Sequence, residues 1–273
     1  MKVVPSFLLC YNQNMDKPYI INTHSHANML RETNIDEAIS NAQAEKIITI
    51  VPASTAEDIF EVDKFVQKYD DVYGYLGVFP EEAKTFTDKT LSDMEELIQN
   101  NKKIIGIGEI GLDYYWDKSF KELQKEVFIK QIDFANQMNL PLNIHSRESH
   151  QDTLEILKKY NKNSTAILHC FSGSIEFAKE CIKEGIYIAL GGVVTFKNAV
   201  KAKEVATEIP LEYLLLETDD PYLAPVPFRG KENQPMYVKY VAQTIAELRG
   251  ISTDEIAQIT TQNAERIFNF NAK

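Results

Sequence analysis

The sequence predicts a single α/β domain folded as a (β/α)8 TIM barrel with an extra C-terminal helix. The chain has 273 residues, close to the ~250 that are typical of this fold. Apolar, β-rich runs alternate along it with segments of helical periodicity, as repeated strand–helix units require. The eight runs begin near Tyr19, Lys46, Val72, Lys103, Leu140, Thr165, Ile186 and Glu212.

The pattern within these elements supports the barrel. The run IITIV (47–51) is apolar without alternation, which is expected of parallel strands covered by helices on both faces. Apolar residues recur at helical spacing over 120–138, and two more helices are predicted around 236–249 and 253–268. Because no Pro/Gly/Ser-rich linker divides the chain, we predict one domain over residues 19–273.

A doubly wound sheet is the competing architecture. The segment GIGEIG (106–111) matches the GxGxxG pattern of dinucleotide-binding folds. In that motif a helix must follow directly, so that its first amides hold the pyrophosphate. Here LDYYWD follows, and the helical pattern resumes only near Ser119. Glu109 would also place a negative charge against the phosphates, so we predict no dinucleotide site.

Composition and charge limit the classes of function. The net charge of −11 disfavours broad electrostatic binding to nucleic acid or to an anionic membrane, but it does not exclude a local cationic pocket. No apolar run approaches the ~20 residues that span a bilayer. The three cysteines show no CxxC spacing, which fits a reducing cytosol. We therefore expect a cytoplasmic protein without membrane attachment or an obligate protein partner.

Residues 1–18 form an N-terminal extension whose role the sequence leaves open. Their apolar run is short, is interrupted by Pro5 and lacks a small-residue cleavage site, which argues against a signal peptide. Met15 precedes the first predicted strand. Either Met15 is the true start, or the extension forms a short extra strand.

Four of the five histidines and two acidic residues fall where an apolar run gives way to a loop. They are His24, His26, Glu109, His145, His169 and Asp219. The C-terminal ends of barrel strands surround the active-site mouth, so we expect these six side chains to converge there. His24 and His26 are two residues apart on a strand, which directs both imidazoles to one side.

Imidazole and carboxylate groups in this combination are ligands for Zn, Mn or Mg. Six ligands exceed what one tetrahedral ion requires, so we predict two divalent metal ions bridged by a carboxylate. Glu109 is the expected bridge because it has two oxygens. Two ions ~3.5–4 Å apart are suited to the cleavage of phosphodiesters. The fifth histidine, His150, lies in a polar loop and is expected at the rim.

Five segments carry a resemblance to a known family. NTHSH, GEIGLDYYW, PLNIHSRE, ILHCFSG and LLLETDDPYLAPVPFRGKENQP resemble, in order, the motifs of the TatD family of metal-dependent deoxyribonucleases, and the similarity extends over about residues 19–268. The resemblance implies a TIM-barrel hydrolase with 3′–5′ exonuclease activity on DNA. It also implies the ligand sets of the two ions: His24, His26, Glu109 and Asp219 for one, and Glu109, His145 and His169 for the other.

The sequence differs from the family pattern at several positions. Asn22 stands where an Asp usually precedes the HxH pair, and Phe79 and Glu81 stand where histidines are common. Asp220 replaces a small residue, and Glu232 replaces an Arg. We expect the extra acids at 220 and 232 to make the pocket less favourable to a polyanion. None of these positions is among the six expected ligands, so the differences concern the substrate.

The expected catalytic residues are Asp219, which accepts the proton of the attacking water, and Glu109, which holds both ions. The expected substrate-binding residues are Arg147, Arg229, Lys231 and Tyr114. An Arg fork can bind a phosphate through two hydrogen bonds. Tyr114 opens the aromatic run YYW, which either stacks on a base, as in single-strand binders, or packs the loop.

Two other classes of function compete with a nuclease. The same barrel and ions could hydrolyse an ester or amide, for example in an aminoacyl-tRNA deacylase. Many relatives bridge their ions with a carboxylated lysine where this chain has Glu109, which favours the nuclease branch. A non-enzymatic interaction protein would not need all six candidate ligands. We therefore predict a divalent-metal-dependent DNase that acts on single-stranded DNA.

Overall fold

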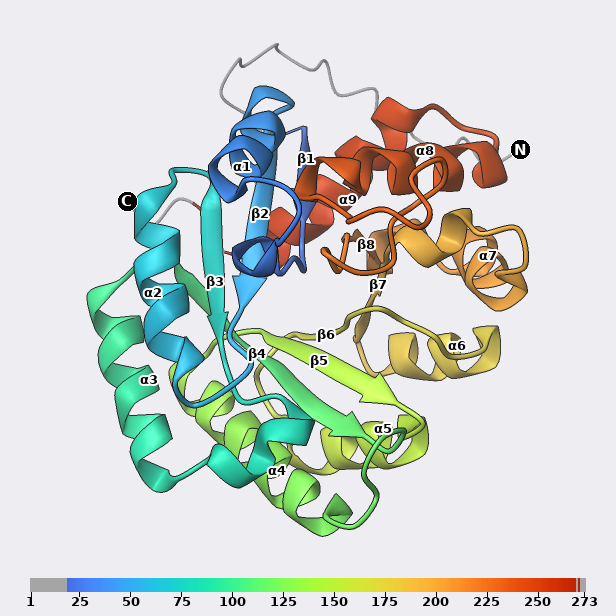
Figure 1. The fold of residues 1–273 in the computed structure, drawn as a ribbon. Coiled ribbons are helices and arrows are strands. Elements are labelled where there is room, and N and C mark those ends of the chain that lie inside the picture. The colour runs from blue at the N-terminus through green and yellow to red at the C-terminus, as the bar shows by residue number, and fades with distance from the viewer. Residues whose placement is uncertain (1–18, 269, 271–273) are drawn as a thin grey trace, which may run out of the picture.

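Eight parallel strands form a closed barrel in chain order, each pairing with the next and β8 pairing with β1. The computed structural model describes residues 19–268 and residue 270. In Figure 1 the helices follow one another around the strands in the same order. The predicted TIM barrel is therefore confirmed. The predicted extension over residues 1–18 lies outside the described residues.

Each strand begins at, or within two residues of, its predicted start. The strands are β1 (Ile20–Asn22), β2 (Ile47–Pro52), β3 (Val72–Leu76), β4 (Ile104–Asp113), β5 (Leu142–Arg147), β6 (Ala166–Leu168), β7 (Tyr187–Leu190) and β8 (Leu214–Leu216). The segment GIGEIG lies wholly inside β4, and the next helix begins at Lys121. As predicted, this segment does not open a helix.

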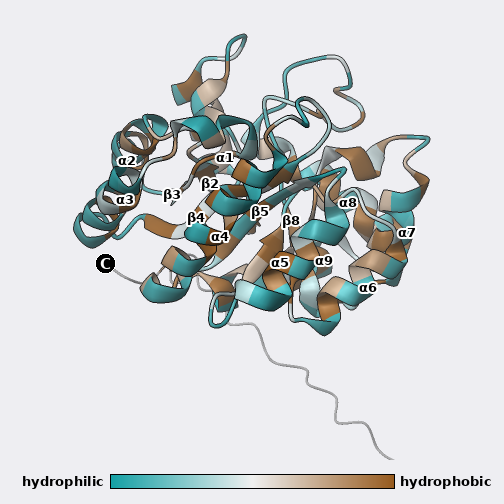
Figure 2. Ribbon diagram, turned by 90° about the horizontal axis from the view of Figure 1, so that it is seen from below, coloured by the Kyte–Doolittle hydropathy of each residue, from teal (hydrophilic) through white to brown (hydrophobic). Residues whose placement is uncertain are grey.

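The helices cover the outside of the barrel. They are α1 (Ile35–Ala44), α2 (Asp58–Lys68), α3 (Asp88–Asn100), α4 (Lys121–Met138), α5 (His150–Tyr160), α6 (Ile175–Lys183), α7 (Val200–Glu208), α8 (Val238–Arg249) and α9 (Thr253–Ile267). Figure 2 shows hydrophilic and hydrophobic residues on the same helices, as expected when one side packs on the strands and the other meets water. No helix in the described part of the chain is long and apolar enough to cross a membrane.

The extra helix α9 closes the end of the barrel at which the strands begin. The Asn263 side chain donates to the carbonyls of Leu211 and Leu214 at 2.7 and 2.8 Å. Phe268, directly after the helix, is buried against the residues that fill the barrel. These are Ile21, Ile48, Ile50, Tyr75, Ile105, Ile167, Ala189, Leu215 and Ala264. The interior is thus a packed core, and the open end is the one where the strands finish.

At that open end, the Glu232 carboxylate ties the long loop after β8 to the loop after β1. It accepts hydrogen bonds from the backbone N–H groups of Arg31, Glu32 and Thr33, with the shortest contacts at 2.7 Å. Burial alone would raise the pKa of Glu232, but these amides outweigh it and hold the pKa below its usual value. The ionised form of Glu232 is therefore favoured by folding.

We expect this contact to make stability depend on pH. A folded-state pKa below the unfolded value of ~4.3 stabilises the protein above that pH, and the contribution is lost as pH falls through the folded pKa. Glu232→Gln should lower the urea midpoint at pH 7, and the difference from the wild type should shrink toward pH 3. Glu265→Gln, on the exposed side of α9, is the control. A pH-independent difference for Glu232→Gln would contradict this account.

Candidate metal centre

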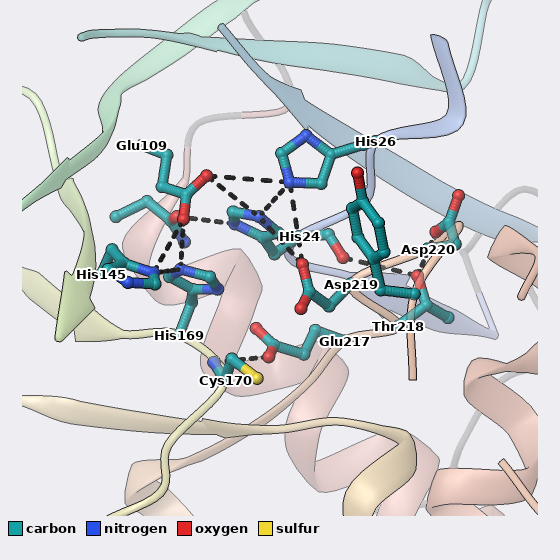
Figure 3. A network of polar contacts seen from close by, with 12 residues as sticks. His24, His26, Glu109, His145, His169, Cys170, Glu217, Thr218, Asp219 and Asp220 are labelled. Atoms are coloured by element: carbon teal, nitrogen blue, oxygen red, sulfur yellow. Dashed lines mark hydrogen bonds and ion pairs between the residues drawn. The ribbon is translucent and has the colours of Figure 1, made fainter. Parts of the chain in front are cut away.

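All six predicted ligands converge at the open end of the barrel, as Figure 3 shows. His24 and His26 follow β1, His169 follows β6, and Asp219 follows β8. Asp219 adopts a left-handed φ of 55°, a conformation that Asp tolerates better than most residues. Four of the six ligands thus occupy the predicted position just beyond a strand.

Glu109 and His145 differ from the prediction, because each lies inside a strand that continues beyond it. Around Glu109 the pairing of β4 with β5 shifts, so that Gly108 and Glu109 together lie opposite Asn143. This is a β-bulge, which redirects side chains and is common beside active sites. A Cβ at Gly108 would lie 2.6 Å from the Asn143 carbonyl oxygen, so only glycine fits there. Figure 3 shows the Glu109 carboxylate pointing toward the four histidines.

The two oxygens of Glu109 face different histidines. Oε1 lies 3.0 Å from Nδ1 of His145 and 2.8 Å from Nε2 of His169. Oε2 lies 3.9 Å from Nε2 of His24 and 3.7 Å from Nε2 of His26. One carboxylate therefore stands between two pairs of imidazoles.

Asp219 completes the side of the cluster that contains the HxH pair. Its Oδ1 lies 3.7 Å from Nε2 of both His24 and His26. Two groups of three ligand atoms each lie within 4.8 Å of one another: His24, His26 and Asp219, and His24, Glu109 and His169. His24 belongs to both groups, and its ring stacks on that of His169 with centroids 3.8 Å apart. The two candidate positions therefore adjoin.

The histidines are held largely neutral, as metal ligands must be. Burial lowers the pKa of His26 and His169, and it lowers that of His24 well below its usual value. His145 is the exception: burial lowers its pKa, but hydrogen bonds to Asp113 and Glu109 outweigh burial and raise the pKa to about 9. A cation next to His145 would take the place of that proton.

The acidic side chains also call for a nearby cation. Burial, and next the charge of Glu109, raise the pKa of Asp219 to about 8, because like charges oppose each other where water is excluded. At 3.7 Å, Oδ1 of Asp219 is too far from the imidazole nitrogens for a hydrogen bond. Two ligand atoms that each lie ~2.0–2.2 Å from one ion are separated by less than ~4.4 Å. The donor set therefore fits divalent cations.

Two residues that the sequence did not indicate orient the histidines. Oδ1 of Asn143 lies 2.8 Å from Nδ1 of His24, and Oδ2 of Asp113 lies 2.9 Å from Nε2 of His145. Both oxygens accept a ring N–H. This leaves Nε2 of His24 with a lone pair that faces the cluster, whereas Nδ1 of His145 would offer one only after a cation displaced its proton. The sequence signal for these two residues is their position on the strands of the ligands. Asn143 is two residues before His145 on β5, and Asp113 ends β4, which carries Glu109.

Buried acids and amides lie beneath the cluster. The Asn22 amide donates to the Thr218 hydroxyl at 2.7 Å, and that hydroxyl bonds in turn to Asp220 (Figure 3). Asp220 is fully buried and does not line the pocket. The Glu232 carboxylate is engaged by backbone amides. Neither acid lines the pocket, whereas Glu81 does. That the acids at 220 and 232 make the pocket less favourable to a polyanion stays a prediction.

A pocket of about 650 Å³ leads from the cluster to the surface. Arg147 is the only predicted phosphate contact among its lining residues, and its guanidinium lies 3.8 Å from the centre of the Tyr115 ring. Trp116 lines the pocket and is 65% exposed, while Tyr114 is buried and donates to Asp152 at 2.8 Å. Tyr114 thus packs the loop, which was one of its two predicted roles.

Two other predicted substrate contacts lie away from this pocket. Arg229 rests on the Phe196 ring, 3.7 Å from its centre, in a separate pocket, and Lys231 is exposed. Their binding roles stay predictions. His150 packs against Phe177, with ring centroids 5.0 Å apart, and does not line the pocket of the cluster.

Comparison with known proteins agrees with the cluster. The model of the family described as TatD related DNase matches residues 21–269. The chain belongs to the TatD family. The Bacillus subtilis metal-dependent hydrolase YabD is 46% identical over 255 residues, which cover 92% of this chain and 100% of that protein. The Escherichia coli K12 metal-dependent hydrolase YcfH is 35% identical over 262 residues, 93% of this chain and 97% of that protein.

Solved structures of TatD proteins have the same fold as this chain. The crystal structure of the TatD homologue YjjV from Escherichia coli has a TM-score of 0.86 at 32% identity, and covers 92% of this chain and 98% of its own. A TatD family hydrolase from Entamoeba histolytica has a TM-score of 0.83 at 20% identity, which supports the fold alone. The chain is thus a metal-dependent hydrolase of the TatD family.

We expect Asp113→Ala to weaken binding of divalent metal by roughly 10–100-fold, because His145 would lose the partner that orients it. Titration calorimetry with Mn²⁺ or Zn²⁺ measures the affinity. Asp117→Ala is the matched control, since Asp117 is exposed in the loop that follows and bonds to the Ser119 amide. Equal affinities of the two variants would contradict the orienting role.

Proposed function

We propose that this TatD family hydrolase cleaves phosphodiesters of single-stranded DNA from the 3′ end, using two divalent ions. The observation that carries the proposal is the placement of Glu109 between two pairs of imidazoles. Two adjacent ion positions with a shared carboxylate suit an in-line displacement at phosphorus, in which both the attacking and the leaving oxygen need stabilisation.

The ligand sets of the proposal follow from these contacts. His26 and Asp219 would hold one ion, His145 and His169 the other, and His24 and Glu109 lie against both positions. Ions held by these residues would act as Lewis acids toward the phosphate and would supply a nucleophile at neutral pH. Mg²⁺, Mn²⁺ and Zn²⁺ all remain compatible with mixed imidazole and carboxylate ligands.

The side chains of the chain itself supply proton transfer and orientation. Asp219 accepts the proton of the attacking water, because its carboxylate borders both the cluster and the pocket. Arg147 binds a non-bridging oxygen of the phosphate, and its stacking on Tyr115 holds the guanidinium in place. The buried walls around Glu109 and His169 exclude bulk water and strengthen these interactions.

The mouth of the pocket supports a single strand as substrate. Trp116 and Tyr222 line it and are 65% and 54% exposed, although each ring also meets a neighbour, Tyr115 and His26 respectively. Exposed aromatic rings of this kind stack on unpaired bases and accept any sequence. The family description, TatD related DNase, agrees with DNA as the polymer.

We expect Asp219→Asn to reduce DNA hydrolysis by at least ~100-fold, the scale of a lost general base, with the circular dichroism spectrum unchanged. Chelation should abolish activity of the wild type, and added Mn²⁺ or Mg²⁺ should restore it. Asp117→Asn serves as the control. Nuclease activity that persists in Asp219→Asn or after chelation would contradict the mechanism.

Substrate class and polarity need a separate assay. Single-stranded DNA, aminoacyl-tRNA and a p-nitrophenyl ester are compared side by side with the same metal. With 5′-labelled DNA, digestion from the 3′ end yields a ladder of shortening strands, whereas 3′-labelled DNA releases the labelled mononucleotide at once. Faster hydrolysis of either ester than of DNA would favour the carbonyl hydrolase, and the opposite labelling pattern would overturn the polarity.

A further inference from the structure

A cluster of cations lies at the open end of the barrel, beside the metal pocket. Residues 192–203, which follow β7, and residues 222–231, which follow β8, contain no Asp or Glu. The two segments lie side by side, since the Val226 amide donates to the Thr195 hydroxyl and the Arg229 guanidinium rests on the Phe196 ring. Their cations are Lys197, Lys201, Lys203, Arg229 and Lys231, which we call the basic patch.

The cations of the basic patch are free to bind a ligand. None of the five forms an ion pair with any residue between 19 and 268. Lys203 donates only to the Lys197 carbonyl, at a long 3.4 Å. Unpaired like charges gathered on one surface repel one another, so an anion bound there would be stabilised.

Two cations of the patch, Lys197 and Arg229, line a pocket of their own. A second pocket of about 550 Å³ is lined by Phe196, Lys197, Asn198, Ala199, Val226 and Arg229. The Arg229 guanidinium lies flat enough on Phe196 to approach within 3.7 Å of the ring centre, which limits its rotamers before any ligand binds. Its donors therefore stay at the wall of the pocket that Lys197 also lines. Loops after strands 7 and 8 are also where TIM barrels frequently bind phosphate.

Lys201 extends the patch along the first turn of α7, four residues after Lys197, and its side chain is exposed. Burial lowers the pKa of His150 at the start of α5, and the charge of Lys201 lowers it further. The patch therefore reaches toward the end of β5, where Arg147 lines the metal pocket.

The two pockets are joined by one short segment. Leu223 lines the metal pocket and Val226 lines the second pocket, and three residues span at most about 10 Å. The segment is held against the loop after β7: the Val226 amide donates to the Thr195 hydroxyl at 2.9 Å, and a Cβ on Gly192 would lie 2.0 Å from the Leu223 carbonyl oxygen. A few nucleotides reach across this distance, since each advances ~3.4 Å even in a stacked duplex.

We propose that the basic patch binds the backbone phosphates of a single strand of nucleic acid several nucleotides away from the phosphate that is cleaved. The proposal rests on the proposed function, because the strand must enter the metal pocket. Short substrates occupy the metal pocket alone, and longer strands gain the phosphate contacts of Lys197, Lys201 and Arg229. The enzyme then discriminates substrates by length.

The test measures DNA binding without cleavage. Full-length Asp219→Asn protein is titrated into fluorescein-labelled oligothymidylates of 4 and 12 nucleotides, and anisotropy gives the affinity at several salt concentrations. Adding Lys197→Glu and Lys201→Glu should weaken binding of the 12-mer at least ~10-fold. The slope of log affinity against log salt should fall by about 1.4, or ~0.7 for each lost phosphate contact. The ratio of 12-mer to 4-mer affinity should fall with it.

Lys179→Glu with Lys183→Glu is the matched control, because these lysines are also exposed, four residues apart and free of ion pairs in the described part of α6. This pair changes the net charge equally, so it should leave the affinity ratio and the salt slope unchanged. If both pairs weaken the 12-mer equally, net charge and not the patch is responsible, and the inference is wrong. It is also wrong if Lys197→Glu with Lys201→Glu binds like the parent.

These outcomes are separable from a failure of the proposed function. If the wild type digests the 12-mer but the patch variants bind it normally, only the patch is excluded. If the wild type neither binds nor digests DNA of any length while it hydrolyses an ester, the nuclease proposal fails and the patch proposal fails with it.

Discussion

The candidate site depends on one carboxylate that is shared between two pairs of imidazoles. Glu109 reaches both pairs only because a bulge in β4 turns it toward them, and the bulge requires the close approach of Gly108 to β5. Around this carboxylate, burial keeps the HxH pair and His169 neutral. Neutral imidazoles can bind a cation, and a bound divalent cation would relieve the repulsion between the carboxylates of Asp219 and Glu109.

Most of the barrel could be predicted because its determinants are local. Buried parallel strands need continuous apolar runs, and IITIV in β2 is such a run. The HxH pair was predictable because it directly follows an apolar run, although both histidines lie beyond the end of β1 and not on a strand, as the alternation argument assumed. The ends of β4 and β5 were not: both strands continue past Glu109 and His145, because pairing with a neighbour extends a strand beyond its apolar core.

The parts of the site that could not be predicted from the sequence are contacts between residues that are distant in the chain. Asn143 and Asp113 act by accepting a ring N–H from a histidine on another strand, and nothing in their local sequence reveals that partner. Asp220 and Glu232 mislead for the same reason. As charges in a sequence they suggested a pocket less favourable to a polyanion, yet neither lines it. Asp220 is buried and bonds to the Thr218 hydroxyl, and Glu232 is ionised and held by backbone amides. A charge acts only where the fold places it.

The packing of α9 against the barrel interior has a consequence for how substrate enters and product leaves the metal pocket. Because Phe268 and its neighbours fill the barrel from the closed end, the metal pocket is a blind cavity. Under the proposed function, a polymer could not thread through it, so a free strand end would be what reaches its floor. Product and substrate would then share one opening, and each released nucleotide would have to leave before the strand advanced. A product that remained bound would compete directly with the next strand end.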